Sequence, residues 1–438
     1  MIKQKKYDSG LRLVVEEMQG FTSVAFNIYV GIGSKNEDET NQGISHIIEH
    51  MLFKGTKKRT AFQIAEDLKS IGAQSNAFTS RSETVFYTKS IKEYAENCVE
   101  ILSDMLLNSV FDSKELKKEK KVIIEELKMY QDDPESVVSE IIDTNFYKGS
   151  PYQSNIIGTK KSITEITREQ IIEYKEKNYV SENIVLSFAG NITIEEAERL
   201  VEKYFKQLLE GNKEIKQTTF VRRVFPEKPI EKFKFKDNAQ SEICISYPCV
   251  DIYSDKKYAI MLLDAIWGSS INMSSRLFQQ IREKMGLVYK IYSSVSSNEY
   301  GGDFSISFST STKNVPVALK AVKEEIDKLI KKGVTENELS VAKVYMHTSI
   351  LLRCENTSYL ALSNARDLVV FGKIISKEEF LGKIDNVTTS DIKEMIEYVY
   401  DNQNFVIACV GKNKDIKLLN CFKSGKESTK KANNKKNK

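Results

Sequence analysis

The chain has 438 residues, of which 41% are hydrophobic and 29% are charged, a composition typical of a globular protein with two or more domains. The formal net charge is +4, but Lys423–Lys438 contains seven lysines and one glutamate, so the remainder of the chain carries a net charge of −2. This distribution argues against a nucleic-acid-binding surface on the folded part. We expect residues 423–438 to form a disordered, Lys-rich tail.

No secretory signal or membrane-spanning segment is visible. The N-terminal residues are polar and basic and lead into a predicted strand, and no apolar run approaches the ~20 residues that cross a bilayer. The six cysteines are scattered without a Cys-x-x-Cys pair, as expected in a reducing compartment. We therefore predict a cytoplasmic protein that is not inserted in a membrane.

The first predicted strand, Val24–Val30, is followed by the apolar segment Gly43–Phe53. This segment contains two of the three histidines of the chain, in the pattern His46-x-x-Glu49-His50. On an α-helix the two imidazoles lie one turn apart on the same face, where they can bind one metal ion with the glutamate beside them. A class of zinc peptidases uses this pattern, with the glutamate accepting a proton from the metal-bound water.

The same histidines could instead be core residues that donate to backbone carbonyls. The apolar flanks predict a buried helix, and a buried Glu49 needs a partner, because an unpaired carboxylate in an apolar site costs several kcal/mol or becomes protonated. One metal ion would explain all three polar groups together.

A predicted helix from Ser113 to about Tyr130 offers a third zinc ligand, since His347, the remaining histidine, lies far away in the second half. Glu119 and Glu126 fall on the apolar stripe of this helix, where charged residues break the expected pattern. If the stripe is rotated slightly, both glutamates are solvated instead. A site with two histidines that needs an acid favours Glu126 as the ligand, with Glu119 orienting a histidine.

The remaining pattern of strands and helices recurs in the two halves, which indicates an internal duplication. We predict an N-terminal domain at 1–210, a polar linker at 211–229 and a C-terminal domain at 230–422. In the second half, Leu262–Gly268 stands where the two-histidine pattern would be expected. The further predicted strands are Thr84–Ser90, Asn183–Gly190, Glu242–Tyr247 and Asp303–Phe308, and the further helices are Ala61–Ile71, Lys92–Leu107, Pro134–Phe146, Val315–Lys331 and Glu336–Arg353.

The two-histidine motif, followed by the two glutamates on the downstream helix, resembles the insulinase-like metallopeptidases (the pitrilysin or mitochondrial-processing-peptidase family, M16). Gly72–Tyr87 looks like the substrate-edge strand of that family and the strand after it, and Ser274–Tyr289 looks like its second-half signature. The resemblance extends from Tyr7 to about Cys421. It departs at Gly268–Met273, where the family often has a run of glycines.

The resemblance implies an α+β fold (an α/β sandwich) with two homologous domains, each a mostly antiparallel sheet with helices packed on it. It implies one Zn²⁺ per chain, bound by His46, His50 and Glu126. Glu49 would be the general base, and Glu119 would orient a histidine ligand.

Two more groups of residues gain a predicted role from the resemblance. Asn76, Ala77 and Phe78 would bind an extended peptide as an additional strand. Arg282 and Tyr289 would donate hydrogen bonds to the peptide carbonyl and the tetrahedral oxyanion. Taken alone, the two residues favour another interpretation, in which Arg282 pairs with a nearby acid and Tyr289 packs in a strand.

These features predict a zinc-dependent endopeptidase that cleaves extended or unfolded peptides. The alternatives are a non-catalytic structural subunit of a related peptidase complex and a metal hydrolase that is not a peptidase. The resembling family builds its chamber from four homologous domains, in one long chain or in two half-length subunits. A half-length chain therefore predicts a homodimer in which Arg282 and Tyr289 of one subunit complete the zinc site of the other.

Overall fold

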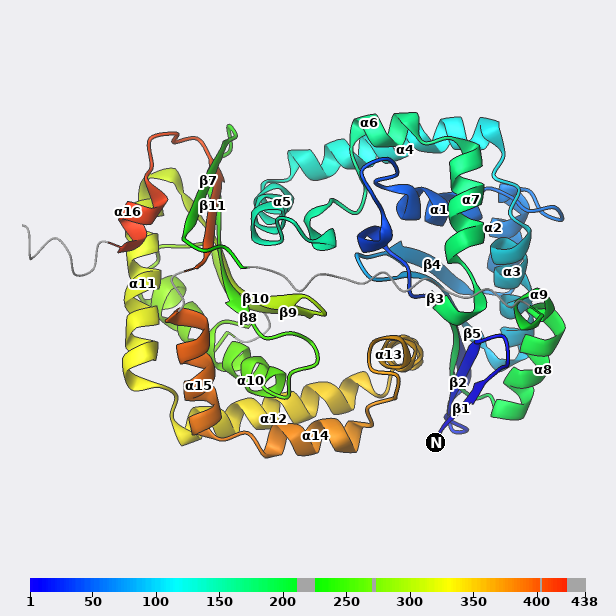
Figure 1. Cartoon of the computed structure of the whole chain (residues 1–438). Helices are drawn as coiled ribbons and strands as arrows, with labels where there is room; N and C mark the ends of the chain where they lie inside the picture. The colour runs from blue at the N-terminus through cyan, green and yellow to red at the C-terminus, as the bar shows by residue number, and fades with distance from the viewer. Residues whose placement is uncertain (211–224, 270–272, 402–403, 424–438) are drawn as a thin grey trace, which may run out of the picture. The chain divides into compact units, whose positions relative to one another are not determined.

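The computed structural model describes the chain in four stretches, residues 1–210, 225–269, 273–401 and 404–423 (Figure 1). Most of the predicted linker 211–229 and nearly all of the predicted tail 423–438 lie outside these described residues. The chain forms two compact units, the first made of Met1–Met129, Ser154–Phe220 and Ile350–Ser376, and the second of Tyr130–Gln153, Val221–Ser349 and Lys377–Lys438.

The first unit is built on a six-stranded sheet with the order β1-β2-β6-β3-β5-β4. Neighbouring strands run antiparallel except for β2 and β6, which are parallel. β4 therefore lies at one edge of the sheet. The strands are β1 (Ile2–Lys6), β2 (Arg12–Glu17), β3 (Ser23–Val30), β4 (Gln74–Thr79), β5 (Thr84–Ile91) and β6 (Ile184–Gly190).

Helices cover both faces of this sheet, because its central strands are apolar on both sides. On one face, Phe26, Ile28 and Phe188 pack against helices from the first half of the chain. On the other face, Tyr29 and Val185 pack against α13 (Thr357–Val370), which comes from the second half. The helices from the first half are α1 (Ile44–Leu52), α2 (Ala61–Ser70), α3 (Ala95–Asn108), α4 (Ser113–Asp132), α6 (Lys160–Glu165), α7 (Arg168–Asn178), α8 (Ile194–Tyr204) and α9 (Lys206–Leu209).

The second unit has a five-stranded sheet with the order β7-β11-β8-β10-β9, in which only β7 and β11 are parallel. One face carries a core with Trp267 and Phe304, under helices of the second half. The strands are β7 (Ile230–Phe235), β8 (Gln240–Cys249), β9 (Lys290–Asn298), β10 (Gly301–Ser311) and β11 (Val406–Gly411), and the helices are α10 (Lys257–Trp267), α11 (Val315–Lys332), α12 (Glu336–Arg353), α14 (Lys377–Asp385), α15 (Thr389–Tyr400) and α16 (Leu418–Lys423).

The opposite face of this second sheet is covered by α5 (Pro134–Phe146), a helix from the first half of the chain. Val138 and Ile142 of α5 pack in one cluster with Val406 and Val410 of β11. Each sheet thus has one face covered by a helix from the other half of the sequence. The two units therefore depart from the predicted boundaries 1–210 and 230–422 at α5 and at α13.

The two sheets share a strand order. The order β2-β6-β3-β5-β4 of the first corresponds to β7-β11-β8-β10-β9 of the second, and each begins with its parallel pair. This correspondence confirms the predicted α+β fold of two similar domains, each with a mostly antiparallel sheet and packed helices.

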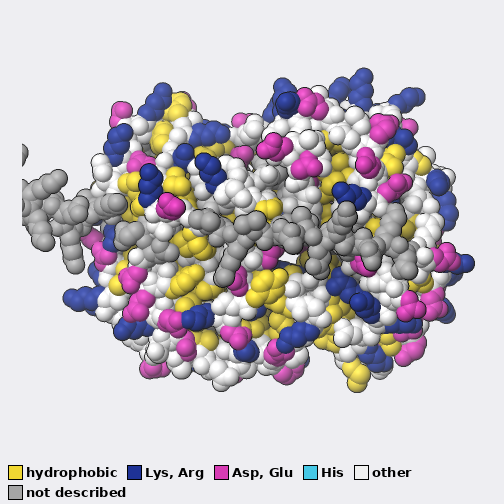
Figure 2. Space-filling model, viewed as in Figure 1, with side chains coloured by type: hydrophobic (Ala, Val, Ile, Leu, Met, Phe, Trp, Pro, Cys, Tyr) yellow, Lys and Arg dark blue, Asp and Glu magenta, His cyan; other side chains and the backbone are white. Residues whose placement is uncertain are grey.

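The described surface agrees with the balanced composition. Figure 2 shows side chains of both charges interspersed over the visible face. Among the described residues, no helix combines the length and the apolar character needed to cross a bilayer. The location of the protein in the cell stays a prediction.

Candidate metal centre

α1, the helix with the two-histidine motif, is held by apolar contacts on most of its surface. It lies in the core of the first unit, against the sheet and α7. This burial fixes the direction of His46, Glu49 and His50, because the helix has one way to bury its apolar residues. The buried apolar residues are Ile44, Ile47, Ile48, Met51 and Leu52.

The N-terminus of α1 is capped by a residue outside the helix. The N-cap residue is Gly43, at φ +89°, where a Cβ would lie 2.3 Å from the carbonyl oxygen of Ile157. The carboxylate of Glu37 accepts hydrogen bonds from the backbone N–H of Gly43 (2.7 Å) and of Ser45 (2.9 Å). Burial raises the pKa of Glu37 to about 7, although these two bonds act to lower it. The role of Glu37 was not predicted from the sequence. The N-cap residue of α1, Gly43, has no side chain that could cap the helix, and an acidic residue a few positions upstream is the one sequence signal for a replacement.

Three potential ligand atoms converge on one point. Glu126 Oε2, on α4, lies 3.8 Å from His46 Nε2 and 3.6 Å from His50 Nε2, and all three atoms are within 4.8 Å of one another. These separations are too long for good hydrogen bonds. In a tetrahedral zinc site with bonds of about 2.0–2.1 Å, ligand atoms lie about 3.3 Å apart, so the donor set fits one shared zinc ion.

The protonation states of His46 and Glu126 favour metal binding. Burial lowers the pKa of His46 to about 4, and the adjacent His50 adds to this effect, so the imidazole is neutral at pH 7. The pKa of Glu126 is held below its ordinary value, first by His50 and then by His46. A neutral imidazole and an ionised carboxylate are the forms that bind zinc.

Glu119 of α4 orients His50 by contacting the ring nitrogen that is not the proposed zinc ligand. His50 Nδ1 lies 3.2 Å from Glu119 Oε2, and the other carboxylate oxygen lies 2.8 Å from Lys54 Nζ. Burial alone would lower the pKa of His50, but Glu126 and Glu119 raise it above its ordinary value. The contact with Lys54 was not predicted from the sequence. By contrast, His46 Nδ1 is buried and has no hydrogen-bond partner among the described residues.

Glu49 lies on the same helix, close enough to His50 and Glu126 for their charges to affect its carboxylate. Burial raises its pKa, and the nearby Glu126 adds to this, while His50 opposes it. Its Oε2 accepts a short hydrogen bond of 2.6 Å from the hydroxyl of Thr79, the last residue of β4.

β4 contains the residues predicted to bind substrate. Among the described strands it pairs only with β5, with Ala77 opposite Phe86. The backbone N–H of Ala77 donates to the side chain of Asn76 (2.9 Å). The ring of Phe78 packs near Tyr87, with ring centroids 6.4 Å apart.

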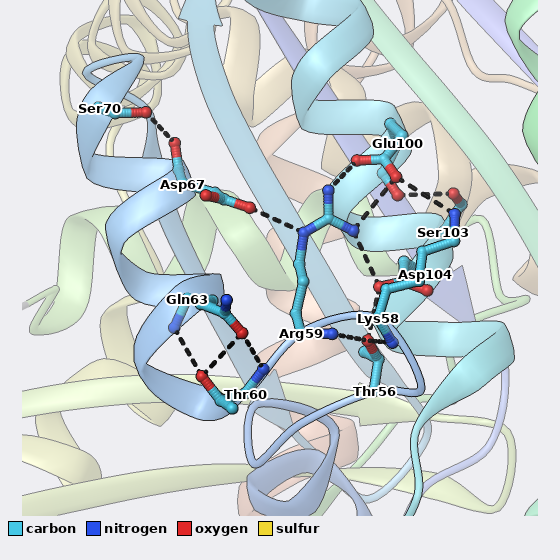
Figure 3. A network of polar contacts seen from close by, with 10 residues as sticks. All are labelled: Thr56, Lys58, Arg59, Thr60, Gln63, Asp67, Ser70, Glu100, Ser103 and Asp104. Carbon is cyan, nitrogen blue, oxygen red and sulfur yellow. Dashed lines mark hydrogen bonds and ion pairs between the residues drawn. The ribbon is translucent and has the colours of Figure 1, made fainter.

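A partly buried ion-pair network fixes the segment that follows α1 (Figure 3). Arg59 donates to Asp67 of α2 (2.8 Å) and to Asp104 of α3 (2.9 Å), and also contacts Glu100. Asp104 accepts a further bond from the hydroxyl of Thr56 (2.7 Å). Burial would lower the pKa of Arg59, but the carboxylates raise it. The sequence showed no local signal for this network, because its members come from three elements.

Comparison with known proteins identifies the family. Residues 12–160 match the family model "Insulinase (Peptidase family M16)", and residues 165–344 match "Peptidase M16 inactive domain". "Uncharacterized zinc protease YmxG" of Bacillus subtilis (strain 168) is 32% identical over 412 residues, which cover 94% of this chain and 98% of the relative. The chain belongs to peptidase family M16. An "Uncharacterized zinc protease" of Rickettsia felis is 34% identical over 392 residues, or 88% of this chain and 92% of the relative.

Known structures share this M16 fold. A protease from Helicobacter pylori superposes with a TM-score of 0.88 at 19% identity, covering 94% of this chain and 99% of that one. The peptidase M16 inactive domain from Pseudomonas fluorescens gives a TM-score of 0.87 at 19% identity, covering 94% and 98%. At this identity the similarity shows the fold. The candidate metal centre lies entirely within the M16 match at residues 12–160.

Arg282 and Tyr289 lie in the second M16 match and in the second unit. Arg282 is in a π-helical segment, Phe278–Lys284, with its guanidinium 4.5 Å from the ring centroid of Phe278 and 3.9 Å from Glu283. Tyr289 precedes β9 and is 71% exposed, so it is not packed in the sheet. Their catalytic role stays a prediction.

Proposed function

We propose that this M16 protein is a zinc-dependent endopeptidase that cleaves extended or unfolded peptides. The observation that carries the proposal is the convergence of ligand atoms from His46, His50 and Glu126 near the half-buried carboxylate of Glu49. The names of its relatives, which are called zinc proteases, support the same metal and reaction class.

When bound at this site, zinc supplies a Lewis acid and lowers the pKa of water to about 7. Glu49 accepts the proton of the attacking water and returns it to the leaving amine. Glu119 holds the ring of His50 in its ligating orientation. We expect one zinc ion per chain, because the residues supply three protein ligands and leave a fourth position open.

The edge strand β4 is the proposed substrate-binding strand. No strand in the described part of the chain lies on its outer side, and the local bond from Ala77 N–H to Asn76 could be replaced by a bond to a peptide carbonyl. Binding through the backbone of Asn76, Ala77 and Phe78 would select extended chains with little sequence preference.

Arg282 and Tyr289 are the proposed hydrogen-bond donors to the oxyanion. In a homodimer, the other subunit would supply them. Both side chains are at least partly exposed, and guanidinium and phenol groups can donate to a developing oxyanion. The two similar domains of the chain, compared with the four-domain chambers of the family, support this assembly.

A non-catalytic subunit is the alternative function. A chain that had lost catalysis would be expected to lack a metal ligand or the base, and this chain has His46, His50, Glu126 and Glu49. The retained set favours the peptidase.

The test is digestion of a peptide library by the wild type beside Glu49→Gln. Glutamine keeps the size of the side chain but cannot accept a proton, so we expect unchanged zinc content and turnover reduced by at least ~10²–10⁴-fold. Cleavage by Glu49→Gln at near wild-type rate would contradict the role of Glu49. A wild type that contains stoichiometric zinc but cleaves no peptide would favour the non-catalytic alternative.

A further inference from the structure

The carboxylate of Glu49 is tied to the strand proposed to bind substrate. Its Oε2 accepts the hydroxyl of Thr79 at 2.6 Å, the length of a strong bond to a charged oxygen. Thr79 is 30 residues further along the chain, at the end of β4, and touches none of the three proposed zinc ligands through a hydrogen bond or ion pair among the described residues.

We propose that Thr79 is a positioning residue for Glu49, an inference that rests on the proposed peptidase function. A glutamate side chain has three rotatable bonds, and a half-buried carboxylate without a fixed partner can adopt several rotamers. The Thr79 hydroxyl occupies one carboxylate oxygen and leaves the other free to accept a proton.

The location of Thr79 in β4 couples this orientation to substrate binding. Side chains two residues apart on a strand point to the same face, so Thr79 and Ala77 share a face of β4. Ala77 packs in the core that contains α1, whereas Phe78 packs in the cluster on the opposite face. One strand therefore presents its edge to a peptide and its inner face to the base, and a shift of the strand would move both.

Threonine suits this task for two reasons. Its hydroxyl supplies the donor, and its β-branch restricts χ1 and favours an extended strand. Valine keeps the branch but removes the donor, and serine keeps the donor but removes the branch. The pair of variants therefore separates the hydrogen bond from the shape of the side chain.

The experiment compares Thr79→Val, Thr79→Ser and the control Thr84→Val. Thr84 pairs with Thr79 across the β4–β5 ladder, but its hydroxyl donates to the carbonyl of Ile32 (3.0 Å). Each variant is assayed for kcat, KM and zinc affinity. Crystal structures of metal-free wild type and Thr79→Val give a readout independent of activity.

We expect Thr79→Val to lower kcat by about 10–100-fold, the cost of a misplaced catalytic group, with KM and zinc affinity unchanged. Thr79→Ser should recover kcat to within a few-fold, and Thr84→Val should keep the wild-type kcat. In the crystal, the carboxylate of Glu49 should leave its wild-type position in Thr79→Val.

Three kinetic results would overturn the proposal. They are a wild-type kcat in Thr79→Val, equal losses in the valine and serine variants, and a rise in KM that accounts for the whole loss. If the wild type itself cleaves no peptide, the proposed function is contradicted. The crystal structures then remain as the test of whether Thr79 positions Glu49. An unmoved Glu49 carboxylate in Thr79→Val rules out the positioning role.

Discussion

The two histidines of α1 differ in what holds their rings, although they are one turn apart. His50 is backed by Glu119, which Lys54 contacts in turn, whereas His46 Nδ1 has no hydrogen-bond partner among the described residues. A hydrogen bond to the second ring nitrogen fixes the tautomer and orientation of a ligating histidine. The orientation of His46 therefore depends on packing within the buried helix.

Removal of the proposed acidic ligand tests the metal centre at the level of single residues. Glu126→Gln should weaken zinc binding strongly, because it removes a charged ligand. The loss should exceed the ~10–100-fold loss of affinity that is typical when a residue that hydrogen-bonds a ligand is replaced. Chelator competition measures this affinity. Glu125→Gln is the matched control, since Glu125 is exposed and pairs with Lys128. Full zinc retention in Glu126→Gln would refute the ligand assignment.

At the level of elements, residues outside α1 fix both of its ends. Glu37 binds the first N–H groups of the helix, and the Arg59 network holds the segment after its last turn. Both contacts involve partly buried polar groups, which are costly to leave unpaired. The geometry of the proposed zinc ligands thus depends on residues that do not touch the metal.

The contribution of the Glu37 cap to stability and to zinc affinity can be measured. Glu37→Ala leaves two N–H groups without their acceptor and should lower the free energy of unfolding of the metal-free protein by about 1–3 kcal/mol. Zinc affinity should also fall, because His46 lies in the first turn. Urea unfolding in EDTA and chelator competition measure the two effects. Glu39→Ala, at an exposed residue two positions away, should change neither; equal effects of both variants would contradict the capping role.

The N-terminus of α12 predicts a pH dependence in the second unit. Glu338 binds Arg276 through two bonds of 2.6 Å and accepts the N–H of Thr335. Burial would raise the pKa of Glu338, but Arg276 and Thr335 lower it to about 2. Because the folded-state pKa is depressed, the stabilisation is complete above the ordinary value near 4.5 and is lost as the pH falls toward 2.

Glu338→Gln should therefore reduce stability by about 1–2 kcal/mol at pH 7, with allowance for partial solvent screening. The difference from wild type should shrink as the pH falls below about 4.5. Urea unfolding of the metal-free proteins between about pH 7 and pH 3.5 measures it. A difference that stays constant over this range would show that the Glu338 carboxylate is not preferentially stabilised in the folded state.

In the molecule as a whole, each half of the sequence contributes one helix to the sheet of the other half. α5 packs on β8 and β11, and α13 packs on β3 and β6. Neither sheet has both apolar faces covered by its own half of the chain. We infer that the two halves do not fold as fully independent domains, since a truncated chain ending near residue 210 would lack α13.

The homodimer proposal has a direct test. Inactive Glu49→Gln and inactive Arg282→Ala are mixed under conditions that allow subunit exchange. If Arg282 and Tyr289 act across subunits, a mixed dimer contains one site with an intact Glu49 and an intact Arg/Tyr pair, and activity should return to up to half of the wild-type level per heterodimer. No recovery despite verified exchange, or full activity of a strict monomer, would exclude the shared site.

Features that depend on local spacing can be predicted from the sequence alone. His46, Glu49 and His50 lie on one helix turn, so the 3.6-residue period brings them together whatever the rest of the chain does. The apolar stripe of α4 likewise pointed to Glu119 and Glu126, and the repeated strand pattern predicted two similar domains, because helix and strand periods can be read without a fold.

Contacts between distant residues become known only when the elements pack into the fold. Glu37, Lys54, Arg59 and Thr79 are ordinary polar residues in the sequence, and their contacts arise because separate elements pack around α1. In the same way, an amphipathic pattern shows that α5 and α13 bury one face, but hydrophobic burial is not directional, and so the pattern does not say which sheet receives that face.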